Sequence, residues 1–223
     1  MRPKDLKAPF RWVERRVVLQ EEVLYVPDLC DHGNWLFPGW AELFGNSHPI
    51  HVEYCAGNGE WVVNKALDNA DVNWVAVEKR FDRVRQIWSK GKNAGVENLL
   101  IVCGEAHQVT RLYFPRGSVE AVYINFPDPW PKQRHAKHRL IHSPFVGEVR
   151  RILVEEGTLT FVTDDPEYAQ RFLDQMEGEE GFALDFTRDE LPGYGGSWFE
   201  RLWREKGKTI RYTRYQKRLP CAV

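Results

Sequence analysis

The sequence has few cysteines and no long apolar stretch. Its cysteines are widely spaced and form no C-x-x-C pair, which excludes a disulfide framework and a zinc knuckle; they are Cys30, Cys55, Cys103 and Cys221. The longest aliphatic run, Leu99–Cys103, is far shorter than the ~20 residues that a membrane span needs. Charges and prolines interrupt the N-terminal residues MRPKDLKAPFRW, so no signal peptide is predicted. We therefore expect a cytoplasmic protein that makes no membrane contact.

A strong charge of one sign is also missing, because the net charge of the 223 residues is −1. The charges are nevertheless segregated along the chain. Segment 201–218 carries eight basic residues and one acid, segment 132–139 carries four basic residues and no acid, and acidic residues cluster at 174–190. Such segregation permits a basic face on a neutral protein, as nucleic-acid binding requires. Solvated helix surfaces are the alternative explanation for each segment taken alone.

Short apolar runs alternate with longer periodic segments from Pro49 onwards. Strands are predicted at 50–54, 73–78, 98–103, 119–124 and 157–163, and helices near 59–70, 80–95, 105–113 and 139–155. This alternation predicts βαβ units and therefore an α/β, Rossmann-like fold with a doubly wound, mostly parallel sheet. Residues 1–48, rich in Pro, Gly and Trp, are expected to form an irregular N-terminal extension, and residues 49–223 the main domain.

The C-terminal part continues this pattern. A helix is predicted at 165–177, with Asp164 or Asp165 as its N-cap and Pro166 in its first turn. Two further strands are predicted at 182–187 and 209–216. For the second of these, an exposed basic C-terminal arm that faces RNA is the alternative.

The first candidate site is the turn Glu53-Tyr-Cys-Ala-Gly57-Asn-Gly59, directly after a strand. Small residues there let the backbone turn sharply and approach a ligand at a helix N-terminus. A dinucleotide-binding turn reads G-x-G-x-x-G, and here the third glycine is absent. The carboxylate of Glu53 would repel a phosphate and attract the ammonium group that S-adenosylmethionine carries. A plain strand-to-helix turn is the alternative.

Two more acids follow the next two predicted strands. Glu78 ends the second strand, where a carboxylate accepts hydrogen bonds from both ribose hydroxyls of a nucleoside. Glu105 follows the third strand and is a candidate acceptor for the adenine amine. Each acid alone could be a helix cap. Because the carboxyl ends of parallel strands face one crevice, the three acids together favour a ligand site.

The most specific segment follows the fourth strand and reads NFPDPWPKQRHAKHRL, from Asn125 to Leu140. Prolines at alternate positions fix φ and stiffen the loop that carries Asp128. Basic residues follow at once: Lys132, Arg134, Lys137 and Arg139. A rigid acid, an aromatic residue and a phosphate-binding cluster within residues 128–139 are hard to explain as core packing. A metal site at His135, His138 and His142 is disfavoured, because the interleaved Lys and Arg repel a cation, and we expect no metal.

This segment resembles the signature of the bacterial tRNA (guanine-N7)-methyltransferase family, and the resemblance extends from about Glu53 to Glu200. The family methylates guanine 46 in the tRNA variable loop. The resemblance implies that Gly57 and Gly59 lie in the cofactor turn and that the acids Glu53, Glu78, Glu105 and Asp128 contact S-adenosylmethionine. Asp128 is also the implied catalytic residue.

The resemblance further implies tRNA contacts at Lys132 and Asp164, and a substrate motif T-x-F-E at Ser197-Trp-Phe199-Glu200. Three positions depart from the family pattern. Cys55 replaces the first glycine of E-x-G-x-G-x-G, Glu105 replaces Asp, and Ser197 replaces Thr. The last two substitutions keep the chemistry, whereas Cys55 affects how closely the turn approaches the methionine moiety.

The implied partner is tRNA, and no obligatory protein partner is evident. The basic residues would hold phosphates, and Trp130, Trp198 or Phe199 would stack on an exposed base, with core packing as the alternative for these aromatics. Two other functions remain open: another Rossmann enzyme, either an oxidoreductase or an amino-directed methyltransferase with an N-P-P-Y motif, and a non-catalytic RNA-binding module. Asn125-Phe-Pro-Asp128 matches N-P-P-Y only loosely, and the intact acids disfavour a module without catalysis.

Overall fold

The computed structural model describes residues 1–11, 14–28, 30–130 and 139–218. The chain divides into two compact units, Met1–Tyr113 and Phe114–Val223. Among the described residues, no helix is both long and apolar enough to cross a membrane.

The first unit contains parallel strands β3 (Ile50–Tyr54), β4 (Asn73–Glu78) and β5 (Leu99–Gly104), ordered β5-β4-β3. Helices α2 (Glu60–Asp68), α3 (Phe81–Ala94) and α4 (Ala106–Tyr113) follow these strands in turn. The central strand β4 is buried along Val75-Ala76-Val77, as expected for a parallel strand covered on both faces. Glu78 pairs in register with Cys103, so the carboxyl ends of β4 and β5 lie together.

The predicted irregularity of residues 1–48 is wrong for residues 18–26. Strands β1 (Val18–Gln20) and β2 (Val23–Val26) form a hairpin, and β2 pairs in parallel with β5. The whole of β2 is buried. Glu21 and Glu22 form its two-residue turn with φ of 54° and 57°, a conformation that normally calls for Asn-Gly. Because two glutamates fill these positions, the turn could not be predicted from the sequence.

Other short elements also lie in the region predicted to be irregular. They are the 3-10 helices η1 (Pro3–Asp5) and η3 (His32–Asn34) and the helix α1 (Trp40–Phe44). The domain boundary at residue 49 remains a prediction, since the compact units divide the chain after Tyr113 instead.

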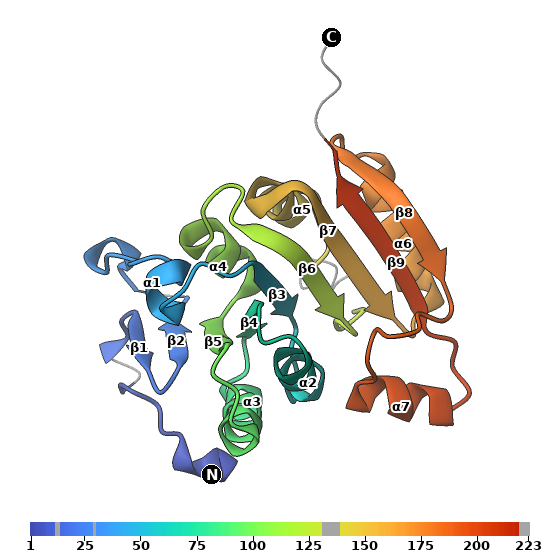
Figure 1. Ribbon diagram of the computed structural model, residues 1–223. Coiled ribbons are helices and arrows are strands. Elements are labelled where there is room, and N and C mark those ends of the chain that lie inside the picture. Colours follow the sequence, from blue (N-terminus) through green and yellow to red (C-terminus); the bar gives the residue numbers. More distant parts are fainter. Residues whose placement is uncertain (12–13, 29, 131–138, 219–223) are drawn as a thin grey trace. The chain divides into compact units, whose positions relative to one another are not determined.

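The second unit is mixed. Its strands β6 (Val119–Asn125), β7 (Leu153–Thr163), β8 (Phe182–Arg188) and β9 (Arg211–Lys217) are ordered β6-β7-β9-β8. Strands β6 and β7 are parallel, whereas β9 is antiparallel to both β7 and β8 (Figure 1). Segment 211–217 is thus a strand hydrogen-bonded on both sides, and the alternative of an exposed C-terminal arm is wrong.

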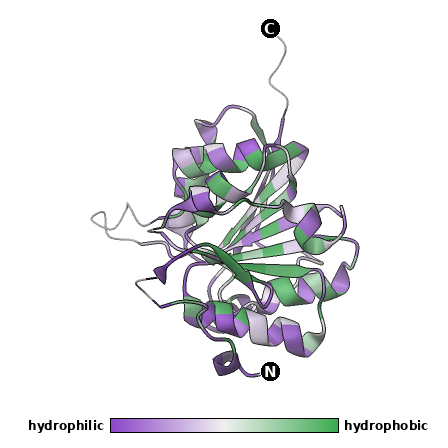
Figure 2. Ribbon diagram, turned by 90° about the vertical axis from the view of Figure 1, so that its left-hand side faces the viewer, coloured by the Kyte–Doolittle hydropathy of each residue, from purple (hydrophilic) through white to green (hydrophobic). Residues whose placement is uncertain are grey.

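Helices α5 (Ser143–Ile152), α6 (Pro166–Glu177) and α7 (Trp198–Glu205) complete the second unit. Asp165 caps α6 as predicted, because its side chain accepts a hydrogen bond from Tyr168 N at 2.8 Å. Helix α7 was not predicted, although Ser197 and Glu200 have the spacing of a capping box and apolar residues recur along the helix at helical spacing. Figure 2 shows hydrophobic residues concentrated on the strands, whereas the helices carry both hydrophobic and hydrophilic residues. The predicted α/β class with a mostly parallel sheet is confirmed.

Candidate functional site

The turn after β3 places every second residue in the left-handed region. The φ angles of Cys55, Gly57 and Gly59 are 59°, 56° and 76°. A Cβ on Gly59 would lie 2.8 Å from Ile87 Cα, so only glycine fits there. Cys55 therefore occupies a position that favours glycine, at a cost of about 1–2 kcal/mol for an L-residue.

The carboxylate of Glu53, in β3, is buried, with 2% of the residue exposed. Glu78 lies at the end of β4 and fixes the turn. Its Oε2 accepts a hydrogen bond from Gly57 N at 3.0 Å, and its Oε1 accepts one from Arg80 N at 2.8 Å. Burial raises the pKa of Glu78 above its ordinary value, and the hydrogen bonds from Arg80, Gly57 and Lys79 oppose this shift. Glu78 thus links the end of β4 to the glycine turn.

Glu105 caps helix α4. Its Oε1 accepts a hydrogen bond from His107 N at 3.1 Å and its Oε2 accepts one from Gln108 N at 2.8 Å. An ionised carboxylate has about four acceptor positions, so Glu78 and Glu105 each keep acceptor capacity for a ligand. The predicted acids of the first unit thus lie at or near the carboxyl ends of three neighbouring parallel strands.

In the second unit, Asp128 lies on a loop whose backbone is strained at both ends. Phe126 and Trp130 have φ of 48° and 43°, in the left-handed region that bulky residues rarely adopt. Pro127 is buried between them, whereas Asp128 is exposed. Strained residues of this kind concentrate at functional sites, where the surrounding structure enforces them. We call residues Phe126–Trp130 the Asp128 loop.

Contacts from several segments hold this loop. Asn125, the buried last residue of β6, accepts a hydrogen bond at Oδ1 from Tyr194 OH at 2.6 Å. Phe126 N donates to Val162 O at 2.8 Å. The ring of Phe126 stacks on Phe199, with centroids 6.2 Å apart and an interplanar angle of 28°.

Arg139 contacts the loop from its C-terminal side. Its Nε donates to Pro129 O at 3.1 Å and to Trp130 O at 3.2 Å, and its Nη2 donates to Trp130 O at 2.9 Å. The phosphate contact expected of Arg139 remains a prediction. Three other predicted phosphate-binding residues lie outside the described residues: Lys132, Arg134 and Lys137.

The Ser197–Glu200 motif begins helix α7. Ser197 is its N-cap, and its Oγ accepts a hydrogen bond from Glu200 N at 3.0 Å. Glu200 Oε1 accepts hydrogen bonds from Tyr212 OH at 2.7 Å and from Arg204 Nε at 3.0 Å. Burial and the Glu200 carboxylate raise the pKa of the Tyr212 phenol, which keeps it protonated as a donor. Phe199 joins this motif to the Asp128 loop through its stack with Phe126.

Sequence reasoning missed Tyr194 and Tyr212, because no local motif marks a phenol that hydrogen-bonds across the unit. For the three aromatic residues that were predicted either to stack on a base or to pack in the core, the structure shows two different environments. Phe199 packs against Phe126 and Trp198, whereas Trp130 and Trp198 are 36% and 43% exposed.

Several basic residues of segment 201–218 are paired with acids inside the second unit. Lys208 Nζ donates to Asp164 Oδ2, Arg211 pairs with Asp189 at 3.0 Å, and Lys217 pairs with Glu155 at 3.1 Å. Arg204 pairs with Glu200 at 3.0 Å. The segment therefore offers fewer cations to a phosphate backbone than its composition suggests.

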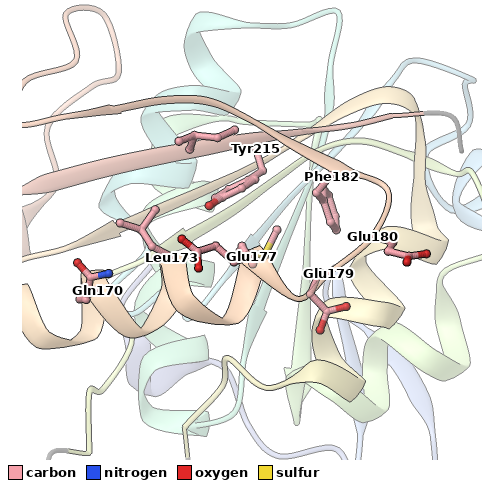
Figure 3. A pocket seen from close by; sticks show the side chains of 9 residues that line it. Gln170, Leu173, Glu177, Glu179, Glu180, Phe182 and Tyr215 are labelled. Carbon is pink, nitrogen blue, oxygen red and sulfur yellow. The ribbon is translucent and has the colours of Figure 1, made fainter. Parts of the chain in front are cut away.

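A groove of about 520 Å³ lies elsewhere in the second unit, beside α6 (Figure 3). Leu173, Phe182 and Tyr215 contribute apolar surface, and Glu177, Glu179 and Glu180 contribute carboxylates. None of the predicted site residues lines it. Its acidic rim is unsuited to binding RNA phosphates.

Comparison with known proteins gives one consistent family. A family model described as "Putative methyltransferase" matches residues 47–212. A relative from Chlamydia abortus named tRNA (guanine-N(7)-)-methyltransferase is 47% identical, over 98% of this chain and 99% of its own. A relative of the same name from Geobacter metallireducens is 34% identical, over 80% of this chain and 86% of its own.

Solved structures share the fold at low sequence identity. A variant of the 16S rRNA (adenine(1408)-N(1))-methyltransferase from Catenulisporales acidiphilia, with cosubstrate SAM, aligns with a TM-score of 0.58 at 16% identity, over 82% of this chain and 92% of its own. TrmN from Thermus thermophilus aligns with a TM-score of 0.55 at 17% identity, over 79% of this chain and 46% of its own. These alignments support a Rossmann-like methyltransferase fold. Because the sequence likeness spans nearly the full length of relatives that share one name, this chain belongs to the tRNA (guanine-N(7)-)-methyltransferase family.

Proposed function

We propose that this protein transfers a methyl group from S-adenosylmethionine to N7 of guanine 46 in the variable loop of tRNA. The observation that carries the proposal is Asp128, an exposed carboxylate on a strained loop that stacks against the Ser197–Glu200 motif. Family membership supplies the reaction class. The purified protein, without a protein partner, is expected to suffice, and the cytoplasm is its expected location.

The first unit has the acceptors that S-adenosylmethionine requires. In this assignment Glu53 pairs with the ammonium group, Glu78 accepts from the ribose hydroxyls, and Glu105 accepts from the adenine amine. The hydrogen bond from Gly57 N to Glu78 holds the glycine turn against the ribose-binding carboxylate. When bound, S-adenosylmethionine supplies an electrophilic methyl group on a sulfonium.

Asp128 would act on the guanine. Guanine N7 carries a lone pair and no proton at neutral pH, so its attack needs alignment more than a strong base. Effective molarities of ~10⁵–10⁸ M are available from positioning alone. Positive charge develops on the purine during transfer, and a fixed carboxylate stabilises that charge while it accepts from N1–H and the N2 amine.

The remaining predicted residues would bind the tRNA. Asp164 and the Ser197–Glu200 motif would contact the nucleotide, with Phe199 packing behind the loop. Lys132, Arg134 and Lys137 would be the phosphate contacts; the same was expected of Arg139 from the sequence, but its guanidinium is hydrogen-bonded to the carbonyls of Pro129 and Trp130. If four to six phosphates are neutralised, the slope of log K against log salt should be roughly −3 to −5. Lys132→Ala should reduce that slope by about 0.7–0.9, whereas Arg211→Ala, whose arginine is paired with Asp189, is the matched control.

The decisive experiment incubates the protein with labelled S-adenosylmethionine and unmodified tRNA, and then identifies the methylated nucleoside and its position. We expect N7-methylguanosine at position 46, and no product with a tRNA that carries adenine there. Methyladenosine would support the amino-directed alternative instead. No transfer at all would support a non-catalytic RNA-binding module.

A further inference from the structure

The Asp128 loop needs an external restraint, because its backbone is left-handed at Phe126 and at Trp130. Neither residue is glycine, so the isolated segment would relax to a more favourable conformation. Relaxation at either end would move Asp128. The contacts that oppose it therefore decide where the carboxylate lies.

The two ends of the loop are held by different groups. At the N-terminal end, Asn125 is hydrogen-bonded by Tyr194, and Phe126 is bound to Val162 O and stacked on Phe199. At the C-terminal end, Arg139 donates hydrogen bonds to Pro129 O and Trp130 O, between 2.9 and 3.2 Å. The Arg139 contacts thus begin at the residue directly after Asp128.

We infer that Arg139 is a positioning residue, which holds the Asp128 loop in its strained conformation by binding the carbonyls of Pro129 and Trp130. This inference rests on the proposed role of Asp128. A guanidinium presents several donors in a fixed plane and serves both carbonyls at once. The ammonium of a lysine is a compact charge on a flexible stem, and it does not reproduce that geometry.

This role differs measurably from a phosphate contact. A phosphate contact depends largely on charge, so lysine would retain much of it, and the remaining loss would appear in the tRNA Michaelis constant and in the salt slope. A positioning role depends on donor geometry, so lysine would fail. Its loss would appear in kcat at saturating tRNA and S-adenosylmethionine, because the substrates still bind while the carboxylate is misplaced.

The test compares Arg139→Lys with Arg150→Lys in the full-length protein. Arg150 Nη1 donates to Glu180 O at 2.6 Å, so its replacement removes a similar carbonyl contact away from the loop. Arg139→Lys should lower kcat about 10- to 100-fold, since small displacements of reacting groups cost up to about 10²-fold. Its tRNA Michaelis constant should change less than about threefold, and Arg150→Lys should retain wild-type turnover.

Hydrogen exchange supplies a readout that does not depend on catalysis. The backbone amides of Phe126, Asp128 and Trp130 should exchange faster in Arg139→Lys than in the wild type, with the rest of the second unit unchanged. If Arg139→Lys does not fold, Arg139→Gln serves, because it keeps one planar donor group and loses the charge. Wild-type kcat with unchanged loop exchange, or a loss confined to the tRNA Michaelis constant and salt slope, would overturn the inference.

Asp128→Asn separates this inference from the proposed function. If Asp128→Asn retains full turnover, the catalytic assignment of Asp128 fails, yet faster exchange of the Phe126, Asp128 and Trp130 amides in Arg139→Lys would still support the restraint. If Asp128→Asn loses turnover while Arg139→Lys behaves as the wild type, only the inference fails. In the double variant we expect no loss beyond that of Asp128→Asn alone, because Arg139 acts through Asp128.

Discussion

In the first unit the candidate carboxylates Glu78 and Glu105 accept hydrogen bonds from backbone N–H groups nearby, whereas in the second unit Asn125 and Glu200 accept hydrogen bonds from side chains in other segments. Glu78 and Glu105 are fixed by the strand ends and helix starts beside them. Asn125 accepts a hydrogen bond from the phenol of Tyr194, and Glu200 accepts one from the phenol of Tyr212 in addition to one from Arg204. We infer that a cofactor site can be built from the backbone of βα turns, while a site for one particular nucleotide needs long-range side-chain contacts.

The largest expected effect concerns the second unit. Asp128→Asn should lower kcat about 10²–10³-fold, because it keeps the shape of the side chain and removes the charge that stabilises the purine cation. Single-turnover assays at saturating tRNA and S-adenosylmethionine measure this loss. Lys132→Ala is the comparison, and it should mainly raise the tRNA Michaelis constant. Full turnover in Asp128→Asn would mean that charge stabilisation is absent, and full turnover in Asp128→Ala as well would remove the catalytic role.

In the first unit, the largest expected effect is on stability and comes from the backbone conformation of the glycine turn. Gly59→Ala should lower the free energy of unfolding by roughly 2–4 kcal/mol, through left-handed strain and the clash with Ile87. Gly95→Ala is the matched control, since Gly95 has φ of +69° but open space around its Cβ position. It should cost only about 1–2 kcal/mol. Equal losses in urea denaturation would show that the clash contributes nothing.

A smaller effect is expected from the charge of Glu78. Only the ionised carboxylate accepts from both ribose hydroxyls, and burial raises the pKa of Glu78. The affinity for S-adenosylmethionine should therefore fall as the pH decreases through a value above the ordinary ~4.3 of glutamate. Glu78→Gln should bind about tenfold more weakly at neutral pH, which corresponds to about 1.4 kcal/mol, and should lose that pH dependence. Calorimetric titration measures both, and a pH profile shared by the two proteins would contradict the assignment.

The smallest expected effect is at Cys55. Cys55→Gly should raise the free energy of unfolding by about 0.5–1 kcal/mol, since it relieves left-handed strain but adds backbone freedom to the unfolded chain. Glu156→Gly, at another left-handed position with φ of 64°, should give a similar gain. Thermal denaturation measures both changes. A loss of stability in Cys55→Gly alone would mean that the thiol makes compensating contacts in the turn.

The sequence allowed prediction of the elements whose signals are local. The strand–helix alternation from Ile50 to Thr163 and the cap of α6 at Asp165 were correctly predicted from apolar periodicity and cap residues. The β1–β2 hairpin was missed because glutamates fill its turn, whereas α7 was missed although Ser197-Trp-Phe-Glu200 has the spacing of a capping box. The predicted strands also located Glu53, Glu78 and Glu105 at or near the carboxyl ends of β3, β4 and β5.

The long-range hydrogen bonds inside the second unit could not be predicted from the sequence, for a physical reason. Tyr194 lies 69 residues from Asn125, and no local pattern specifies that pairing. The composition of segment 201–218 suggested a free basic arm, yet the fold pairs four of its cations with acids. Charge in a sequence predicts a basic face only where tertiary neighbours leave the cations exposed.

The position of β9 between β7 and β8 has a consequence for how the chain folds. Strand β8 is synthesised before β9 but is hydrogen-bonded to it, so this part of the sheet cannot assemble in the order of synthesis. Until Arg211–Lys217 inserts, the facing edges of β7 and β8 present unpaired backbone groups, which are templates for aggregation. A truncation before β9 would therefore report on misfolding rather than on RNA affinity, and production of the protein should be sensitive to conditions that slow this late insertion.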